Sequence, residues 1–374
     1  MSIMEKSKVY YSDLRARPGL NLLDKLERLI KKAGIENIDF KEKFVAIKIH
    51  FGEPGNLSFL RPNYAKVVAD VVKELGGKPF LTDCNTLYVG RRKNALDHID
   101  SAYENGFTPF STGCNVIIAD GLKGTDEALV PINLDYIKEA KIGQALMDAD
   151  IVISLTHFKG HECTGFGGAL KNIGMGGGSR AGKMEMHNAG KPQVTENKCK
   201  SCGACMKICA HSAISFNENR KAVIDHKSCV GCGRCIGTCN FNAVRAQNDE
   251  SNDILNAKIA EYTYAILKDR PHFHISLVID VSPNCDCHAE NDMPIIPDVG
   301  MFASFDPVAL DMACVDAANK QKPISESHLG DQIKKEVKAE DNFCISHPDT
   351  NWRTCLSHAE KIGLGTREYE LIKV

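Results

Sequence analysis

Eight of the sixteen cysteines fall in two runs of identical spacing, and these runs carry the clearest chemistry in the sequence. The first run is CKSCGACMKIC and the second is CVGCGRCIGTC, and both follow the pattern C-x2-C-x2-C-x3-C. Thiolates at this spacing bind [4Fe–4S] clusters, and in two-cluster proteins the fourth cysteine of each run ligates the other cluster. The sequence therefore predicts one cluster held by Cys199, Cys202, Cys205 and Cys239, and a second held by Cys229, Cys232, Cys235 and Cys209.

Two structural zinc sites would also use four cysteines each, but such sites usually pair two C-x2-C knuckles across longer loops. The segment around the runs repeats internally, each run being followed by a short apolar stretch. This is typical of a bacterial two-cluster ferredoxin, although Ala210 and Asn240 stand where that pattern usually has proline. We predict an inserted 2[4Fe–4S] ferredoxin-like domain over residues 191–246.

The charge of residues 191–246 bears on the partner. This segment has nine Lys or Arg and three acids, a net charge of +6, whereas the whole chain has −2. Two bound clusters with their thiolates would contribute about −2 each. The remaining positive charge favours docking of an acidic redox partner such as a ferredoxin or flavodoxin, or a partner enzyme. Lysines that only solvate the surface would give the same count. The net charge indicates neither a nucleic-acid nor a membrane partner.

The chain on either side of this segment alternates between strand and helix patterns. Apolar, β-branched runs predict strands, and apolar residues at helical spacing predict helices between them. The expected strands are 43–52, 78–85, 114–121, 149–157 and 272–281, the expected helices are 61–77 and 256–269, and 301–320 is expected to form a strand followed by a helix. Such alternation is typical of an α/β fold with a mostly parallel sheet and helices on both faces. We predict a body formed by residues 1–190 and 247–374, interrupted by the α+β ferredoxin-like domain.

A glycine-rich stretch, residues 168–187, lies between the strand 149–157 and the first cysteine run. It is expected to be a loop at the carboxyl edge of the sheet, where α/β proteins bind ligands. Its cations Lys171, Arg180 and Lys183 suit an anionic group, and His157, His161 and His187 are candidate proton donors. Alternatively the stretch only covers the neighbouring cluster. GGSRAGK lacks the Ser or Thr of a phosphate loop, so a nucleotide site is not indicated.

The motif SPNCDCHAEND places Cys285 and Cys287 close together after an expected strand. With neighbouring histidines they could bind zinc or another thiophilic metal, whereas a polar loop with reduced thiols is the simpler interpretation. The cysteines Cys84, Cys114, Cys163 and Cys314 are expected to be buried as small apolar side chains.

Several motifs together resemble one known family. HFKGHECTGFGGALKNIGMGGGSRAGKMEMH, the double cysteine run, NCDC and DVGMFASFDPVALD are similar to the domain of unknown function 362 family over nearly the full length. Members are often described as uncharacterised Fe–S centre or 4Fe–4S-binding proteins. The resemblance implies an α/β body with an inserted two-cluster ferredoxin domain, and electron transfer without a settled substrate.

These patterns lead to one prediction about function and two alternatives. We predict an iron–sulfur electron-transfer protein that passes low-potential electrons to or from a redox partner docked on the α/β body. One alternative is a reductase that binds an anionic organic substrate or flavin beside residues 157–187 and reduces it. The other is a metal-site enzyme that uses Cys285 and Cys287. Many cysteines in a long chain without an apolar leader favour a cytoplasmic, anaerobic setting over disulfides in a secreted protein.

Overall fold

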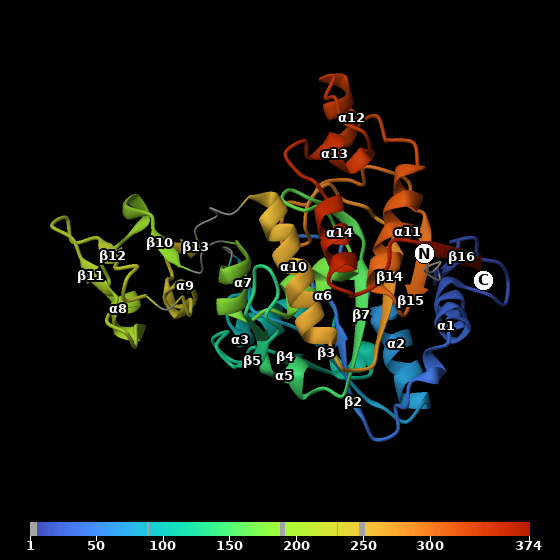
Figure 1. Ribbon diagram of the computed structural model, residues 1–374, viewed down its shortest axis with the longest axis horizontal. Helices are drawn as coiled ribbons and strands as arrows, with labels where there is room; N and C mark the ends of the chain where they lie inside the picture. The colour runs from blue at the N-terminus through green and yellow to red at the C-terminus, as the bar shows by residue number, and fades with distance from the viewer. Residues whose placement is uncertain (1–5, 88–89, 188–190, 230, 247–250) are drawn as a thin grey trace.

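The computed structural model describes residues 6–87, 90–187, 191–229, 231–246 and 251–374. Its centre is an eight-stranded sheet with helices on both faces (Figure 1). From one edge to the other, the strands are β16 (Tyr369–Lys373), β1 (Ser7–Ser12), β15 (Gly300–Ser304), β14 (His272–Val278), β7 (Ile151–His157), β2 (Phe44–Lys48), β3 (Lys78–Asp83) and β4 (Asn115–Ile118). The strands from β14 to β4 are parallel, whereas β15 runs antiparallel to both of its neighbours. The prediction of a mostly parallel α/β sheet is confirmed.

The sheet separates two apolar cores, because successive residues of a strand point to opposite faces. In β2, Val45 and Ile47 join one core and Ala46 joins the other; in β7, Ile153 and Val152 divide in the same way. The first residues of both strands are mostly apolar because both faces of the sheet are covered there. The central strands thus form a rigid layer, and their carboxyl ends present the residues that follow at one edge.

Helices cover each core. On one face lie α1 (Leu22–Lys32), α2 (Pro62–Glu74) and α3 (Ala95–Glu104), and on the other lie α6 (Ala169–Gly177), α10 (Asn252–Leu267), α11 (Pro307–Asn319) and α14 (Arg353–Lys361). The shorter elements are η1 (Ile35–Asn37), α4 (Pro109–Thr112), α5 (Gln144–Asp148), α7 (Arg180–His187), α12 (His328–Lys334), α13 (Asn342–Ser346) and the hairpins β5–β6 (Glu127–Pro131, Glu139–Gly143) and β8–β9 (Lys159–His161, Gly165–Gly167).

The glycine-rich stretch 168–187 is helical, and the expectation of a loop was wrong. It forms α6 and α7, which meet at Gly178 and Ser179. The glycines serve close packing: a Cβ on Gly174 would lie 2.3 Å from the Ile259 carbonyl oxygen of α10, and one on Gly176 would lie 2.3 Å from Lys48 Nζ. Because a glycine pattern looks alike in a flexible loop and in a tightly packed helix, composition alone did not distinguish them.

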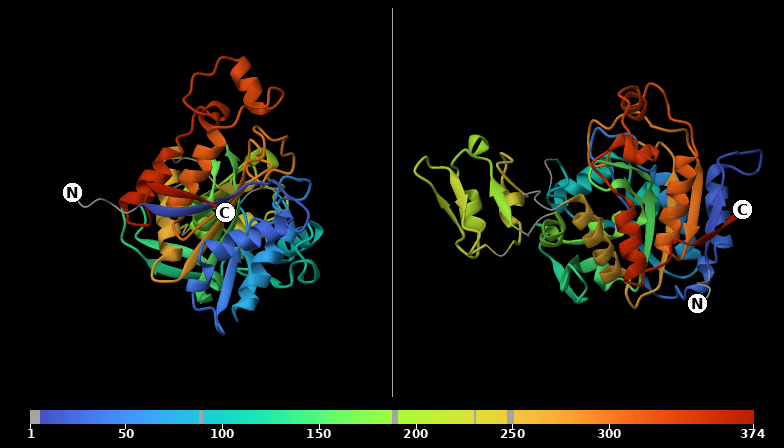
Figure 2. Two further views of the ribbon diagram at one scale, coloured as in Figure 1. Left: turned by 90° about the vertical axis from the view of Figure 1, so that its right-hand side faces the viewer. Right: turned by 45° about the horizontal axis from the view of Figure 1, so that its top comes forward.

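Residues 191–246 form a group of small elements beside the sheet (Figures 1 and 2). These elements are β10 (Pro192–Val194), η2 (Glu196–Lys198), α8 (Ala204–Ile208), β11 (Ile214–Phe216), β12 (Ala222–Ile224), α9 (Arg234–Thr238) and β13 (Val244–Ala246). β10 pairs with β13 and β11 pairs with β12, both antiparallel. We call this segment the cysteine module. The exact boundaries assigned from sequence stay a prediction, since residues 188–190 and 247–250 lie outside the described residues.

In the described part of the chain, no helix has both the length and the apolar character needed to cross a membrane.

Candidate functional site

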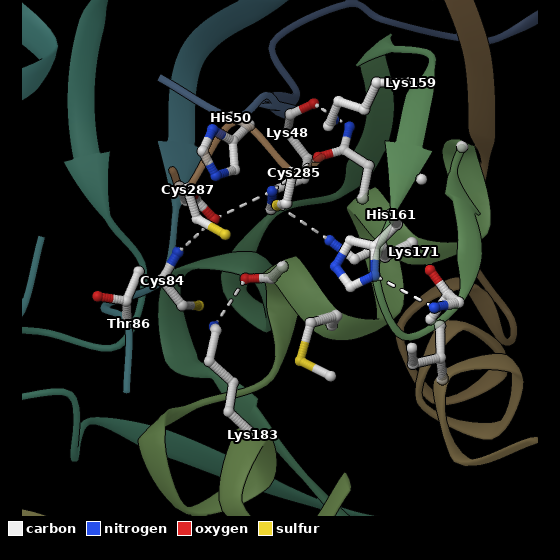
Figure 3. A pocket seen from close by; sticks show the side chains of 18 of the residues that line it. Lys48, His50, Cys84, Thr86, Lys159, His161, Lys171, Lys183, Cys285 and Cys287 are labelled. Carbon is white, nitrogen blue, oxygen red and sulfur yellow. Dashed lines mark hydrogen bonds and ion pairs between the residues drawn. The ribbon is translucent and has the colours of Figure 1, made fainter. Parts of the chain in front are cut away.

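A pocket lies beyond the carboxyl ends of β2, β3, β7 and β14, at the edge where parallel sheets bind ligands. Its volume is about 680 Å³, including its open mouth. Lys48 and Asp83 come from the ends of β2 and β3, His161 follows β7, and Cys285 follows β14. Helices α6 and α7 close the opposite wall with Lys171, Asn172, Lys183 and His187. Figure 3 shows these side chains gathered around one cavity.

Buried cations dominate the pocket wall. Lys48 Nζ lies 3.0 Å from Asp83 Oδ1 and donates to Asn172 Oδ1 at 2.9 Å. Burial lowers the pKa of Lys48, while Lys48 and the neighbouring histidines hold the pKa of Asp83 below its usual range despite that carboxyl's own burial. Arg92 is likewise buried and bonds to Glu53 with an Nε–Oε2 distance of 2.8 Å. These two pairs are charge-balanced within the wall.

Lys183 differs from these cations. Its ammonium donates to the carbonyl oxygens of Gly178 at 2.6 Å and Gly176 at 3.2 Å. Within the described residues, no carboxylate oxygen lies within 4.0 Å of it, although the side chain is buried and faces the pocket. A buried ammonium without a carboxylate partner attracts an anion, because burial weakens the screening of its charge. Lys183 is therefore the wall residue best suited to bind an anionic group of a ligand.

Two cysteines form part of the same wall. Lys171 Nζ lies 3.3 Å from Cys285 Sγ, and the dashed line in Figure 3 marks this contact. The neighbouring Cys287 side chain, together with the Lys171 ammonium, holds the pKa of Cys285 well below its usual range, even though burial acts in the opposite direction. Cys285 and burial raise the pKa of Cys287. The pKa values of the two thiols are thus shifted in opposite directions.

The three candidate histidines lie in different surroundings. His161 and His187 line the pocket, whereas His157 is buried outside it and bonds through Nδ1 to Asp286 at 2.9 Å and through Nε2 to the Ile279 carbonyl at 2.9 Å. The backbone N–H groups of Cys163 and Thr164 point at His161 Nδ1, so its proton lies on Nε2. Burial lowers the pKa of His187 to about 3, which keeps that ring neutral. His161 is thus the ring placed to donate a proton inside the pocket.

Groups compatible with metal binding occur beside the pocket. Glu162, Cys287 and His288 offer ligand atoms within 4.8 Å of one another, and so do His161, Glu162 and Cys163. Glu162 raises the pKa of His288 to about 9, and that ion pair competes with a metal for the same atoms. Cys285, which the sequence analysis paired with Cys287 as a metal site, belongs to neither group.

The structure brings each predicted cluster set together. Cys199, Cys202, Cys205 and Cys239 line one cavity of about 340 Å³, and Cys209, Cys229, Cys232 and Cys235 line another of about 350 Å³. In each set the fourth cysteine comes from the other run. Backbone N–H groups donate to Cys209 Sγ at 3.4 Å and to Cys239 Sγ at 3.3 Å. Four cysteines around one cavity, with N–H bonds to some of their sulfurs, are a donor set that fits an iron–sulfur cluster.

Helix α7 lies between the pocket and the cysteine module. Lys183 faces the pocket, whereas Met184 packs in the apolar core of the module. Gly233 of the second cysteine run lies against this helix: a Cβ there would be 2.8 Å from the Arg180 side chain and 2.9 Å from Met184 Sδ. Arg180 also donates to the Lys123 carbonyl at 3.0 Å. It does not line the pocket, so its expected role in binding the same anion as Lys183 is not supported by its position. Instead it joins the α/β body to the second cysteine run.

Four pocket residues escaped the sequence analysis, namely Lys48, His50, Asp83 and Arg92. A signal existed for three of them, because a charged or imidazole side chain at the end of an apolar strand is unusual in a buried parallel sheet. The strand 43–52 contains Lys48 and His50, and the strand 78–85 contains Asp83. Arg92 had no such signal because it belongs to a connection between elements.

Comparison with known proteins identifies the family. Residues 45–316 match the model of the "Domain of unknown function (DUF362)". The chain belongs to this family. This region includes the four central parallel strands, the glycine-rich helices and the whole cysteine module. Among curated proteins, the "Thylakoid-associated protein sll1697" of Synechocystis sp. is 29% identical over 123 residues, which is 32% of this chain and only 34% of that protein.

Two solved structures are distantly similar. The lactate racemase apoprotein of Thermoanaerobacterium thermosaccharolyticum has a TM-score of 0.41 at 12% identity, with 84% of this chain and 58% of that chain covered. A Thermotoga maritima protein has a TM-score of 0.39 at 13% identity, with 78% and 57% covered. Likeness at this level carries no argument about the activity of the DUF362 chain.

Proposed function

We propose that this DUF362 protein is an iron–sulfur oxidoreductase that takes low-potential electrons through the cysteine module and reduces an anionic organic molecule in the pocket. The observation that carries the proposal is the position of α7. One short helix presents Lys183 to the pocket and Arg180 and Met184 to the module. A ligand held by Lys183 would therefore lie next to the second cysteine run.

Two [4Fe–4S] clusters are the cofactors that fit the module. The set with Cys229 and Cys235 lies on the side of Arg180, because a Cβ on Gly233 or Gly237 of the same run would meet the Arg180 side chain, so this set faces the body. Cys202 of the other set is exposed at the surface. When bound, such clusters supply single electrons at low potential. An acidic carrier would deliver electrons to the exposed set, and the positive charge of residues 191–246 supports docking of such a carrier there.

The pocket residues supply the remaining functions. Lys183 binds the anionic group, whereas the charges of Lys48 and Arg92 are balanced by their own carboxylate partners. His161 holds a proton on Nε2 and is the candidate donor. Apolar Leu255 and Ile259 of α10 complete the lining and exclude water from part of the cavity.

The test measures iron and ligand binding on full-length protein purified without oxygen. We expect about eight iron and eight sulfide per chain. Acetate, benzoate, malonate and inorganic phosphate are then titrated calorimetrically. At least one carboxylate should bind and should change the electron paramagnetic resonance spectrum of the dithionite-reduced protein.

Lys183→Met should weaken that carboxylate about 10- to 100-fold, since a hydrogen bond to a charged group contributes about 1.5–3 kcal/mol. Lys227→Met is the matched control, because Lys227 is an exposed lysine of the module. An unchanged Kd in Lys183→Met, or the absence of binding by all four anions, would contradict the proposed pocket function.

The second candidate is an electron carrier whose α/β body docks a partner enzyme. The exposed Cys202 set and the basic module favour it equally well. It predicts the same iron content but no ligand response, so the titration separates the two functions.

A further inference from the structure

The cysteine pair at the pocket has a geometry that neither anion binding nor cluster ligation uses. Cys285 and Cys287 are free thiols two residues apart in one turn, and both line the pocket. We propose that Cys285 and Cys287 form a reversible intramolecular disulfide, which gives the pocket wall a store for two electrons.

Hydrogen bonds hold the backbone around the cysteine pair. The His288 N–H donates to the Cys285 carbonyl at 3.0 Å, which closes a turn with both cysteines inside it. The Asp286 carbonyl accepts from the Glu53 N–H at 2.9 Å. The Asp286 carboxylate bonds to His157 Nδ1 at 2.9 Å and lies 3.2 Å from Lys159 Nζ.

These bonds have one consequence for the sulfurs. Because the residue between the cysteines is anchored through its backbone and its side chain, the two thiols stay next to each other at the pocket. This anchoring also explains His157, a conspicuous histidine in the sequence that does not reach the cavity. It is a positioning residue for the turn.

The position of Lys171 favours a redox pair over a metal site at these two cysteines. Its ammonium lies 3.3 Å from Cys285 Sγ, and its side chain is half-buried. A metal ion bound to both sulfurs would compete with the Lys171 ammonium for Cys285 Sγ. The ammonium would then have to move away or lose its charge. A disulfide has no such conflict, because Cys285 loses its charge on oxidation while Lys171 remains free to receive an anionic ligand.

The reaction balances as follows. Oxidation forms one S–S bond and removes two electrons from the pair, and the thiol protons are released to solvent. A small disulfide, or a two-electron acceptor bound in the pocket, receives the electrons. The reverse reaction breaks the S–S bond and needs a dithiol or two successive single-electron donations. The role of the pair in turnover rests on the proposed oxidoreductase function, whereas the disulfide itself does not.

The experiment is a redox titration of the full-length protein in buffers of reduced and oxidised dithiothreitol. After each equilibration the protein is denatured in excess N-ethylmaleimide, and the peptide that contains Cys285 and Cys287 is weighed. We expect this peptide to pass from doubly alkylated to unalkylated and two hydrogen atoms lighter, along one two-electron curve. Cys344→Ser should give the same curve, because Cys344 lies in α13 away from the pair.

Two further variants keep the result interpretable. Lys171→Met should shift the midpoint toward easier disulfide formation, because the cation that stabilises the reduced thiolate is gone. His157→Gln should broaden or shift the curve while Cys344→Ser does not. Iron content checks that each variant is folded.

A peptide that stays doubly alkylated in oxidised dithiothreitol, or loses only one label, would overturn the proposal. So would protection of both thiols without the loss of two hydrogens, reversed by a chelator, which is the signature of a bound metal. The anion titration described above is independent: it can fail while the disulfide forms, and the reverse is equally possible, so the two ideas are tested separately.

Discussion

The buried pair of Lys48 and Asp83 gives the sharpest quantitative prediction. Both side chains are almost fully buried, and their charged atoms are 3.0 Å apart. Lys48→Met leaves a carboxylate in the wall without its principal partner. Breaking a buried ion pair from one side costs about 3–5 kcal/mol. Asp83 keeps a weaker contact with Arg92 Nη1 at 3.8 Å, so we expect the lower end, about 3 kcal/mol at pH 7.5.

The loss of stability caused by Lys48→Met should depend on pH, and its direction follows from the pKa of Asp83. In the native protein, Lys48 and the nearby histidines hold the pKa of Asp83 below its unfolded value, so this carboxyl contributes stability above about pH 4 that is lost as the pH falls toward the folded pKa. Without Lys48, burial dominates and raises the pKa of Asp83. Protonation then relieves the unpaired charge, and the loss of stability caused by Lys48→Met should fall by about 1–2 kcal/mol between pH 7.5 and pH 5.

The assay is urea unfolding followed by the fluorescence of Trp352, which is the only tryptophan and is buried in the α/β body. The double variant Lys48→Met/Asp83→Asn should lose less stability than the sum of the two single variants, because no charge is left unpaired. Lys227→Met, at an exposed site, should change nothing. A loss below about 1 kcal/mol in Lys48→Met, or the same loss at both pH values, would refute the reasoning.

Three further predictions concern α6 and the cysteine module. Gly174→Ala should destabilise the protein by about 1–3 kcal/mol in urea unfolding, because its Cβ would lie 2.3 Å from the Ile259 carbonyl oxygen, whereas Gly177→Ala meets a side chain that can rotate and should cost less. Burial raises the pKa of Asp311 to about 7, so native stability should fall as the pH rises from about 4 to 7. Asp311→Asn should remove that pH dependence. At pH 5 the variant should also lose about 1–3 kcal/mol of stability, because it loses a hydrogen bond to the start of α6. Reduction of the module by an acidic ferredoxin, followed by stopped-flow absorbance, should slow with added salt, and a rate independent of salt would exclude electrostatic docking.

The parts of the fold that were predictable have strong local patterns. The apolar runs of β2, β3, β7 and β14 and the helical spacing of α2 and α10 appear where the sequence placed them. The edge strand β16 and its neighbour β1 were not anticipated, because each is half-exposed and their pairing joins segments remote in the chain. Strand pairing between the two chain ends is a tertiary contact, and no local pattern encodes it.

The site shows the same division between local and tertiary information. The cysteine spacing alone predicted which fourth cysteine joins each set, and the structure places them in those groups. Conversely, Lys171 and Lys183 belong to one stretch of sequence, yet Lys171 contacts a thiol 114 residues away, whereas the Lys183 ammonium donates to backbone carbonyls of its own helix junction. Which of two lysines is available for a ligand depends on what the rest of the fold brings to each.

The functions proposed for the two halves of the protein involve complementary electron chemistry, and α7 is where the two halves meet. The cysteine module fits cofactors that move electrons singly, while the organic reactions open to a pocket of lysines and a histidine generally move them in pairs. A thiol pair at the pocket wall would reconcile the two, since it can collect two electrons before a ligand is reduced. Loss of Cys285 would then leave iron content and anion binding intact while removing the two-electron store. Loss of Lys183 would weaken anion binding and leave the two-electron store intact. Variants of these two residues therefore distinguish electron storage from anion binding.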